Sequence, residues 1–479
     1  TDEIGVAGSK DDMDKLYRQF DVDANGDYGH QYDYPMPAIM GSLVDDAFSQ
    51  SIGGISIDEQ SLFTTSTPQA RNSIPFHKRR QCAGNTNCIP ICPIQAKYDA
   101  TVTLAHALQT SNVEILYQHV ASNIDVGEDD LITQIEFKHY QGDIYQCGSV
   151  TAKKFVIAAH AIETPKLLLM SNKNARFPNG VANSSDQVGR NLMDHVMYLS
   201  WALTDEPVYA YRGPLSTSGI ESLRDGAFRK DRAAYRIEIG NEGWQWAADD
   251  PFTTLADFVF GQNNTQLNSS GENQQGDSLK FDSELADNSQ LFGRQLVETL
   301  NKVYTRQIRL GFLIEQLPDP ENRVELSELT DNLGLPRPKV TYRIQDDYVR
   351  NAFVSAKQVS SDIYQAMGAT EYTRQPDDAV IYGDPDDVTS NTFSYQGDNY
   401  RFYGAGHIVG TYRMGDDKAT SVVNQRQQSW DHSNLFLVGS GVFPTVATGN
   451  PTLTIAALAL QAAEHILADL GVVSTHIVS

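Results

Sequence analysis

The most informative stretches of this sequence are GAGHIVGTYRMG at residues 404–415 and LFLVGSGVFPTVATGNPTLTIAALAL at residues 435–460. The second stretch begins with a short apolar run, passes through a glycine-bearing turn and ends in a helix of small apolar residues. A strand that enters a helix also occurs at residues 153–171, and that succession is typical of a doubly wound sheet. We therefore expect a mixed α/β fold. His407 and Asn450 are its candidate catalytic residues.

These two side chains suit the oxidation of an alcohol. A base must take the hydroxyl proton while the carbon loses a hydride, and a neutral histidine can accept that proton. An asparagine can hold the oxygen, but no side chain accepts a hydride, so a cofactor is required. A lone histidine beside glycine is typical of an ordinary loop, and only the joint pattern favours catalysis. That pattern comprises Val438, Gly439, Gly441, Pro444, Asn450 and Thr452.

Composition sets limits on the class of protein. With 479 residues, the chain is expected to form two or three packed subdomains. The net charge of -24 argues against a nucleic-acid or anionic-membrane partner. The sequence has no run of 18 or more apolar residues, so no transmembrane segment is predicted, and no signal peptide is recognisable. The longest apolar candidates, residues 453–463 and 154–170, are expected to be a buried helix and a strand-turn-helix.

Three of the four cysteines lie close together. Cys82, Cys88 and Cys92 have C-x5-C-x3-C spacing with a proline after the third, whereas Cys147 stands alone. The trailing Cys-Pro is typical of iron-sulfur loops. Zinc would need a fourth ligand, for which His77 is the candidate. An oxidising compartment could instead pair two of the thiols, so spacing alone leaves an iron-sulfur cluster and a disulfide equally open.

The C-terminal stretches resemble the signature of the glucose-methanol-choline (GMC) oxidoreductases. The segment CIPICPIQAKYDA resembles the cysteine loop of the bacterial FAD-dependent sugar dehydrogenases in that family. The resemblance implies that His407 and Asn450 face a flavin and the substrate hydroxyl. It also implies that Cys82, Cys88 and Cys92 hold a 3Fe-4S cluster that carries electrons to a cytochrome c subunit. Oxygen-using members lack this loop. Many relatives have a second cysteine where this chain has Ala83.

Three further blocks extend the resemblance. KKFVIAAHAIETPKLLLMS at residues 153–171 predicts a strand and then a helix that Thr164 caps, with Pro165 in its first turn. VEILYQHV at residues 113–120 predicts a strand. In VGRNLMDHV, at residues 188–196, Asp194 and His195 are expected to lock a turn rather than to catalyse.

By resemblance, these blocks and the C-terminal stretch supply the residues that contact FAD. The family usually has Ala-Ala-Gly where this chain has Ala158, Ala159 and His160, which puts the close approach to the cofactor in doubt. The expected FAD contacts are Val120, Ala159, His160, Thr164, Asn191, Gly439, Ser440, Asn450, Pro451 and Thr452.

In the middle of the chain, short strand-like runs are separated by polar insertions. YLSWAL, AAYRIEI, QIRLGFLIEQL and RVELS predict an antiparallel sheet, with a polar insertion at residues 261–277 and a helix at 347–367. In the family such a sheet roofs the active site and selects the substrate. The expected divisions are residues 1–75, a linker region; 76–197, the cysteine loop and part of the FAD-binding domain; 198–370, the substrate domain; and 371–479, the rest of the FAD-binding domain.

One expected element is missing from the sequence. No G-x-G-x-x-G loop between a strand and a helix is present to hold the FAD diphosphate, so we expect that segment on a companion chain or a preceding region. The doubly wound domain is therefore expected to be incomplete at its N-terminal side. A separate acidic stretch at residues 21–27 imitates a calcium loop, but Tyr32 replaces the required glutamate and a hydrated turn is favoured.

The resulting expectation is a dehydrogenase that oxidises a hydroxyl of a sugar, polyol or sugar acid. The resemblance implies a bacterial periplasmic location, membrane association through a partner, and two partners, a small chaperone-like subunit and a cytochrome c subunit. The alternatives are an oxygen-using oxidase with a structural disulfide and a non-catalytic scaffold or fragment.

Overall fold

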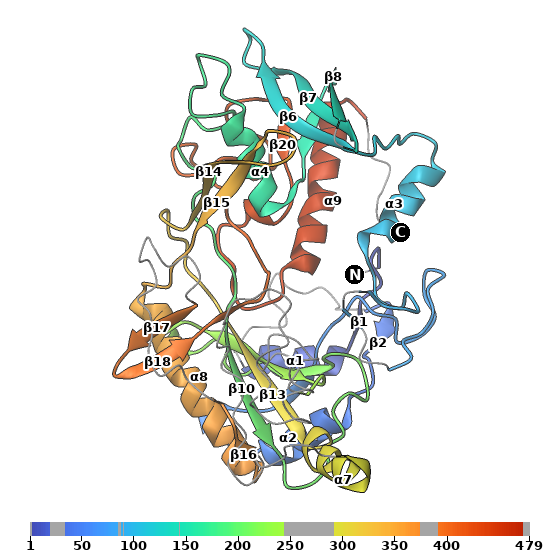
Figure 1. Ribbon diagram of the computed structural model, residues 1–479, viewed down its shortest axis with the longest axis vertical. Coiled ribbons are helices and arrows are strands. Elements are labelled where there is room, and N and C mark those ends of the chain that lie inside the picture. Colours follow the sequence, from blue (N-terminus) through green and yellow to red (C-terminus); the bar gives the residue numbers. More distant parts are fainter. Residues whose placement is uncertain are drawn as a thin grey trace. The chain divides into compact units, whose positions relative to one another are not determined.

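The computed structural model describes residues 2–19, 34–84, 88–89, 91–142, 144–243, 292–373 and 391–472. The chain forms two compact units (Figure 1). The first comprises Thr1–Gln109, Met197–Ile314 and Asp346–Tyr403, and the second comprises Thr110–Val196, Glu315–Gln345 and Gly404–Ser479. The calcium-like stretch at residues 21–27 and the polar insertion at 261–277 lie outside the described residues.

The first unit contains a sheet with the strand order β16-β10-β13-β12-β11-β5, and β19 also pairs with β10. The pairs β5–β11, β11–β12, β12–β13 and β10–β16 are antiparallel. This finding confirms the predicted antiparallel sheet. Its strands are β5 (Thr64–Ser66), β10 (Val196–Leu203), β11 (Ser218–Ile220), β12 (Tyr235–Gly240), β13 (Gln307–Ile314), β16 (Thr370–Glu371) and β19 (Tyr403–Gly404).

Helix α8 (Asp347–Ala366) packs on one face of this sheet, as Figure 1 shows. Its bounds confirm the predicted helix, which begins because the Asp346 side chain accepts the backbone N–H of Tyr348. Phe353 on α8 meets Tyr198 on β10 edge to face, with ring centroids 6.3 Å apart. Aromatic packing of this kind closes the core of the first unit.

The other elements of the first unit are short or peripheral. Its helices are α1 (Lys10–Gln19), α2 (Leu43–Ser51), α3 (Ala100–Gln109) and α7 (Gly293–Tyr304), with a 3₁₀ turn η1 (Ala227–Lys230). Its remaining strands form two-stranded pairs: β1 (Ala7–Gly8) with β2 (Met36–Pro37), β3 (Ser56–Ile57) with β4 (Gln60–Ser61), and β17 (Thr392–Tyr395) with β18 (Asp398–Arg401).

The second unit is built around a parallel strand pair. β9 (Phe155–Ile157) pairs with β20 (Leu435–Leu437), and both are buried apart from Val156. Side chains alternate along a strand, so the two faces of β20 pack on different helices. Leu435 and Leu437 lie in the core that includes Leu167 and Leu168 of α4 (His160–Met170). Phe436 points to the other face and packs on α9 (Thr452–Asp469). Helices therefore cover both faces of the pair, which is the predicted doubly wound arrangement.

Two antiparallel sheets complete the second unit. One is a meander of β6 (His119–Val126), β7 (Ile132–Gln141) and β8 (Ile144–Val150), and the other is a hairpin of β14 (Arg323–Thr330) and β15 (Pro336–Thr341). RVELS is thus a strand as predicted, but it lies in this hairpin and not in the large sheet. The strand expected at residues 113–120 begins only at His119, because Gln118 is a turn residue with φ of 60°.

The predicted capping of α4 is wrong. The helix begins at His160, so Thr164 and Pro165 lie inside it, although the Thr164 hydroxyl accepts the N–H of Ala159 at 3.1 Å. A proline inside a helix leaves the carbonyl four residues earlier without its N–H partner. Here that carbonyl belongs to Ala161, and the Thr411 hydroxyl donates to it at 2.6 Å. A side chain from a distant segment therefore replaces the hydrogen bond that Pro165 cannot make.

Helix α9 was expected to be buried. It is a helix, but of its described residues only Ala462 is fully buried. Its contacts with β20 involve one side of the helix, through Ala459, Ala462 and Ile466. None of the helices in the described part of the chain has the length and hydropathy needed to cross a bilayer.

Candidate active site

A backbone clamp places the segment that contains His195 beside the segment that contains His407. The N–H groups of Met193 and Val409 each donate to the carbonyl oxygen of the other residue, at 3.0 and 2.9 Å. The N–H of Ala405 donates to the carbonyl of His195 at 3.1 Å. These antiparallel contacts fix the register, so that the two histidines face each other.

Asp194 orders the turn that carries His407. Its Oδ1 accepts the backbone N–H of His407 at 2.7 Å, and its Oδ2 accepts that of Gly406 at 3.1 Å. The N–H of Asp194 in turn donates to Oε1 of Gln316, which also accepts the Tyr342 hydroxyl. Burial raises the pKa of Asp194, and the backbone N–H groups partly oppose that rise. The expected turn-locking role of Asp194 is observed, and the turn is that of the candidate base.

The two imidazole rings are in direct contact. Nδ1 of His195 lies 2.8 Å from Nδ1 of His407, and Nε2 of His195 lies 2.9 Å from the carbonyl oxygen of Ala447. The rings are nearly perpendicular, at 89°. His195 is completely buried, whereas His407 is half-buried. The sequence offered a signal for this pair, since each histidine lies in one of the quoted motifs, but the contact between them was not predicted.

Asn450 lies in the loop that His195 holds. Ala447, whose carbonyl contacts His195, is three residues before Asn450, and the Asn450 side chain is exposed. Pro451 caps the start of α9 without a side-chain hydrogen bond to its first turn, and Thr452 is exposed at that turn. The N-terminal N–H groups of a helix favour a negatively charged or electron-rich ligand.

The carboxyl ends of β9 and β20 meet at one edge of the parallel pair. The N–H of Val438 donates to the carbonyl of Ile157 at 2.9 Å, and the chain beyond each strand end turns at this edge. Ala159 and His160 are exposed there, and Gly439 is half-buried beside the buried Ser440. Ligands of doubly wound folds bind at such an edge, so these residues fit a dinucleotide cofactor.

By resemblance, a glycine was expected at the position of His160. Its φ is 69°, in the left-handed region that suits glycine and that histidine adopts at some cost. The backbone therefore keeps the conformation that glycine would give, and the substitution alters the exposed side chain instead.

The remaining expected FAD contacts are dispersed within the second unit. Val120 is half-buried on β6, opposite Lys138 of β7. Thr164 is fully buried in α4, and Asn191 is buried with its Nδ2 donating to Oε1 of Gln187 at 3.1 Å. Buried side chains can support a cofactor site through the backbone that they hold, but they do not present a contact surface.

The cysteine loop lies in the first unit. All four cysteines lie among the described residues and are thiols. Within the described ranges, no set of three His, Cys, Asp or Glu side chains is placed to hold a metal ion, so the three cysteines do not converge on one centre. Burial raises the pKa of the Cys92 thiol, but the N–H groups of residues 94–97 together lower it below the ordinary value. A lowered pKa favours the thiolate, the form that binds metals.

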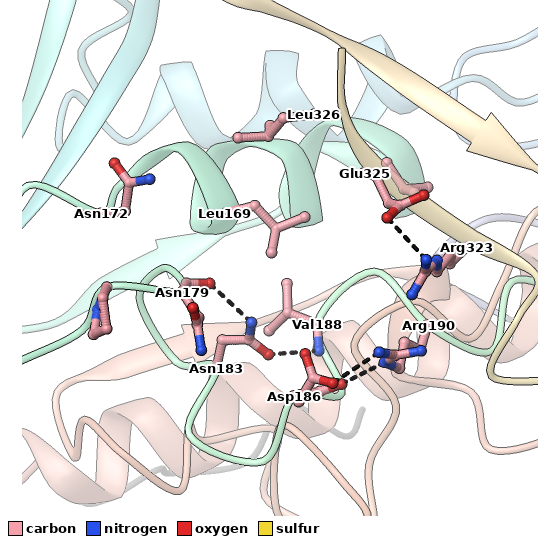
Figure 2. Close-up of a pocket in the computed structure, with 12 residues that line it drawn as sticks. Leu169, Asn172, Asn179, Asn183, Asp186, Val188, Arg190, Arg323, Glu325 and Leu326 are labelled. Atoms are coloured by element: carbon pink, nitrogen blue, oxygen red, sulfur yellow. Dashed lines mark hydrogen bonds and ion pairs between the residues drawn. The ribbon is translucent and has the colours of Figure 1, made fainter. Parts of the chain in front are cut away.

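Figure 2 shows a surface pocket of about 480 Å³ in the second unit, between the end of α4 and β14. Arg190 faces Asp186 at 2.8 Å and Arg323 faces Glu325 at 3.0 Å, so each guanidinium already has a carboxylate partner. The pocket is lined by none of the candidate catalytic or cofactor residues. Its lining consists of Leu169, Asn172, Pro178, Asn179, Asn183, Asp186, Val188, Arg190, Arg323, Val324, Glu325 and Leu326.

Comparison with known proteins identifies the family to which the chain is similar. The N-terminal and C-terminal GMC oxidoreductase family profiles match residues 67–197 and 318–459. The fructose dehydrogenase large subunit of Gluconobacter japonicus is 36% identical over 92% of this chain and 68% of its own length. Paromamine 6'-oxidase of Streptomyces fradiae is 27% identical over 86% of this chain and 62% of its own length.

More distant relatives extend the match. The 2-methyl-1,2-propanediol dehydrogenase of Mycolicibacterium austroafricanum is 26% identical over 66% of this chain, which spans 48% of that enzyme. The crystal structure of pyridoxine 4-oxidase from Mesorbium loti superposes with a TM-score of 0.56 at 18% identity, over 96% of this chain and 81% of that one. That likeness concerns the fold. Because the match to the fructose dehydrogenase large subunit covers 92% of this chain at 36% identity, and both family profiles match as well, the chain belongs to the GMC oxidoreductase family.

Proposed function

We propose that this chain is the catalytic part of a dehydrogenase that oxidises a hydroxyl of a sugar, polyol or sugar acid to a carbonyl. The observation that carries the proposal is the ordered contact of His407 with Asp194 and His195, which aims a half-buried imidazole from a fixed turn. The similarity to a fructose dehydrogenase large subunit supports a sugar as the substrate class.

The protein residues handle the proton and the oxygen. The O–H bond of the substrate breaks and its proton moves to the His407 imidazole, while the carbon–hydrogen bond breaks with its electron pair. Asn450 donates a hydrogen bond that orients the oxygen. Family membership implies FAD as the cofactor; when bound, it supplies the hydride acceptor. The residues that would hold it are those at the edge formed by the ends of β9 and β20, together with the first turn of α9.

The finer part of the proposal concerns the electrons. A 3Fe-4S cluster on Cys82, Cys88 and Cys92 and a cytochrome c subunit would complete the dehydrogenase, together with a small chaperone-like subunit. This part rests on the cysteine spacing, on their thiol state and on the resemblance to sugar dehydrogenases. The described geometry does not bring the three cysteines together. Periplasmic, membrane-associated placement through such a partner belongs to the same proposal.

The decisive experiment combines composition with activity. FAD and iron are released from the purified, denatured protein and counted per chain, and reduction of the flavin by sugars and polyols is followed by absorbance. His407→Ala should lower the rate at least a hundredfold, while His465→Ala on the side of α9 should leave it within twofold.

Each outcome has a distinct meaning. FAD with about three irons per chain would support the dehydrogenase with a 3Fe-4S cluster. FAD without iron, together with consumption of oxygen, would replace it by the oxidase. Absence of FAD and of any sugar-dependent reduction would favour a non-catalytic scaffold, and a His407→Ala variant with the wild-type rate would remove the proposed base.

A further inference from the structure

The direction of the hydrogen bonds around His195 can be derived from its partners. A backbone carbonyl oxygen only accepts hydrogen bonds, so Nε2 of His195, 2.9 Å from the Ala447 oxygen, must carry a hydrogen. A neutral imidazole has one N–H, and Nδ1 of His195 is therefore an acceptor. The hydrogen between the two rings, whose Nδ1 atoms lie 2.8 Å apart, must then belong to His407.

The neutral state of His195 follows from its surroundings. The side chain is completely buried, and a charged imidazolium is costly to bury. The adjacent carboxylate, that of Asp194, directs its two oxygens to the backbone N–H groups of Gly406 and His407. A neutral ring that donates through Nε2 and accepts through Nδ1 satisfies both contacts at once.

We propose that His195 is a positioning residue that fixes the tautomer of His407. With its hydrogen held on Nδ1, His407 is left with Nε2 as the unprotonated nitrogen, and this nitrogen takes the substrate proton. The proposal rests on the function proposed above, because it names the atom of His407 that acts as base. It also gives the proton-loaded His407 a stabilising contact, since a charged N–H donor strengthens the bond to Nδ1 of His195.

This arrangement resembles the orienting part of a Ser-His-Asp triad, with a neutral histidine and a backbone carbonyl where the triad has an aspartate. Loss of the orienting aspartate in that setting lowers the rate by about 10⁴. A neutral acceptor discriminates less strongly between the two tautomers than a carboxylate does. We therefore expect removal of the acceptor to lower kcat by about tenfold to a hundredfold, with a smaller change in KM.

Two variants separate the hydrogen bond from the packing. His195→Leu keeps an apolar filling but removes the acceptor, whereas His195→Asn keeps an oxygen near the position of Nδ1. The first readout is the ¹⁵N NMR spectrum of the full chain labelled at histidine, in which His407→Gln identifies the signals of His407. This readout requires neither substrate nor bound flavin. The second is kcat for flavin reduction by sugar.

The expected result is a protonated Nδ1 on His407 in the wild type and in His195→Asn, and a shift towards protonated Nε2 in His195→Leu. kcat should fall further in His195→Leu than in His195→Asn. A wild-type His407 protonated on Nε2, or an unchanged tautomer in His195→Leu, would overturn the proposal; the wild-type spectrum alone suffices if a variant does not fold. The expected tautomers in a chain that oxidises no sugar would refute the proposed function while leaving the tautomer assignment intact.

Discussion

Replacing Gly410 by alanine tests whether the clamp between the two histidine segments is as tight as described. Gly410 has φ of 97°, and a Cβ built there would overlap the backbone carbonyl oxygen of Asn191. Because that oxygen belongs to the backbone, it can move only if the segment leading to His195 moves with it. Gly410→Ala should therefore lower stability and also pull His195 away from His407.

The magnitude follows from two costs and one gain. A left-handed conformation costs an L-residue about 1–2 kcal/mol. Overpacking costs about 1–3 kcal/mol more, and the reduced freedom of the unfolded chain returns about 0.4–1 kcal/mol. The net loss should be about 1–5 kcal/mol, with a midpoint of about 3 kcal/mol. Gly406→Ala is the matched control, because φ there is 71° but nothing lies within 4 Å of the added Cβ, so only the strain remains.

The assay is urea-induced unfolding followed by far-UV circular dichroism, with the rate of sugar-dependent flavin reduction measured on the same samples. Gly406→Ala should lose about 1 kcal/mol or less, well below the loss in Gly410→Ala. If Gly410→Ala lost less than 1 kcal/mol, or no more than Gly406→Ala, the described contact with Asn191 would be wrong. If it were destabilised but fully active, the register of the clamp would not matter for the site.

Further predictions concern other positions. Changing His160 to glycine should raise the free energy of unfolding by about 0.5–1 kcal/mol, because it relieves left-handed strain, and a lower melting temperature would contradict this. Asp194→Asn should slow sugar oxidation at least tenfold, because the amide NH₂ is a donor and cannot accept one of the two backbone N–H groups that Asp194 binds. The same change at Asp186, which lies in an exposed ion pair, should leave the rate within twofold. Burial raises the pKa of Tyr412 from 10.0 to about 12, so the stability that its neutral phenol contributes is complete below pH 10 and is lost as the pH rises towards 12. The melting temperature of Tyr412→Phe should therefore fall less steeply at alkaline pH than that of the wild type. Parallel curves of melting temperature against pH for the two proteins would refute this. In the iron-free chain, the rate at which iodoacetamide alkylates Cys92 should rise with pH, and the midpoint pH of that rise should lie below the midpoint for a cysteine in a short peptide. Mass spectrometry of the peptide that contains Cys92 measures the rate.

The sequence predicted those helices and strands that short-range residue patterns determine. The helix predicted at residues 347–367 is observed at 347–366, where its buried positions recur on one face and Asp346 caps its start. Strands β10, β12 and β13 were found because apolar and β-branched residues dominate short runs bounded by turns. The doubly wound part of the fold followed from the strand that enters a helix at residues 153–171.

Other features depend on residues that are distant in sequence, and local patterns could not reveal them. Pro165 was expected at a helix start, because nothing nearby compensates for a proline inside a helix; the compensating hydroxyl comes from Thr411. His195 was expected only to help lock a turn, because its contact with His407 joins positions 212 residues apart. The candidate base itself was recognisable because it lies within a compact motif.

Some hydrogen bonds of the second unit join residues that are far apart in sequence, and this affects how the unit forms during synthesis. The backbone N–H of Ile132 donates to the Asn434 side chain, 302 residues later, and His195 meets Ala447 across 252 residues. At about 5–20 residues per second, a ribosome needs about 15–60 s to deliver the second partner of the Ile132 contact. During that interval the meander can form locally, but the apolar side chains of β9 lack their strand partner. Those side chains therefore stay exposed on the nascent chain for that time, and the histidine pair can form only after His407, 212 residues beyond His195, has been synthesised.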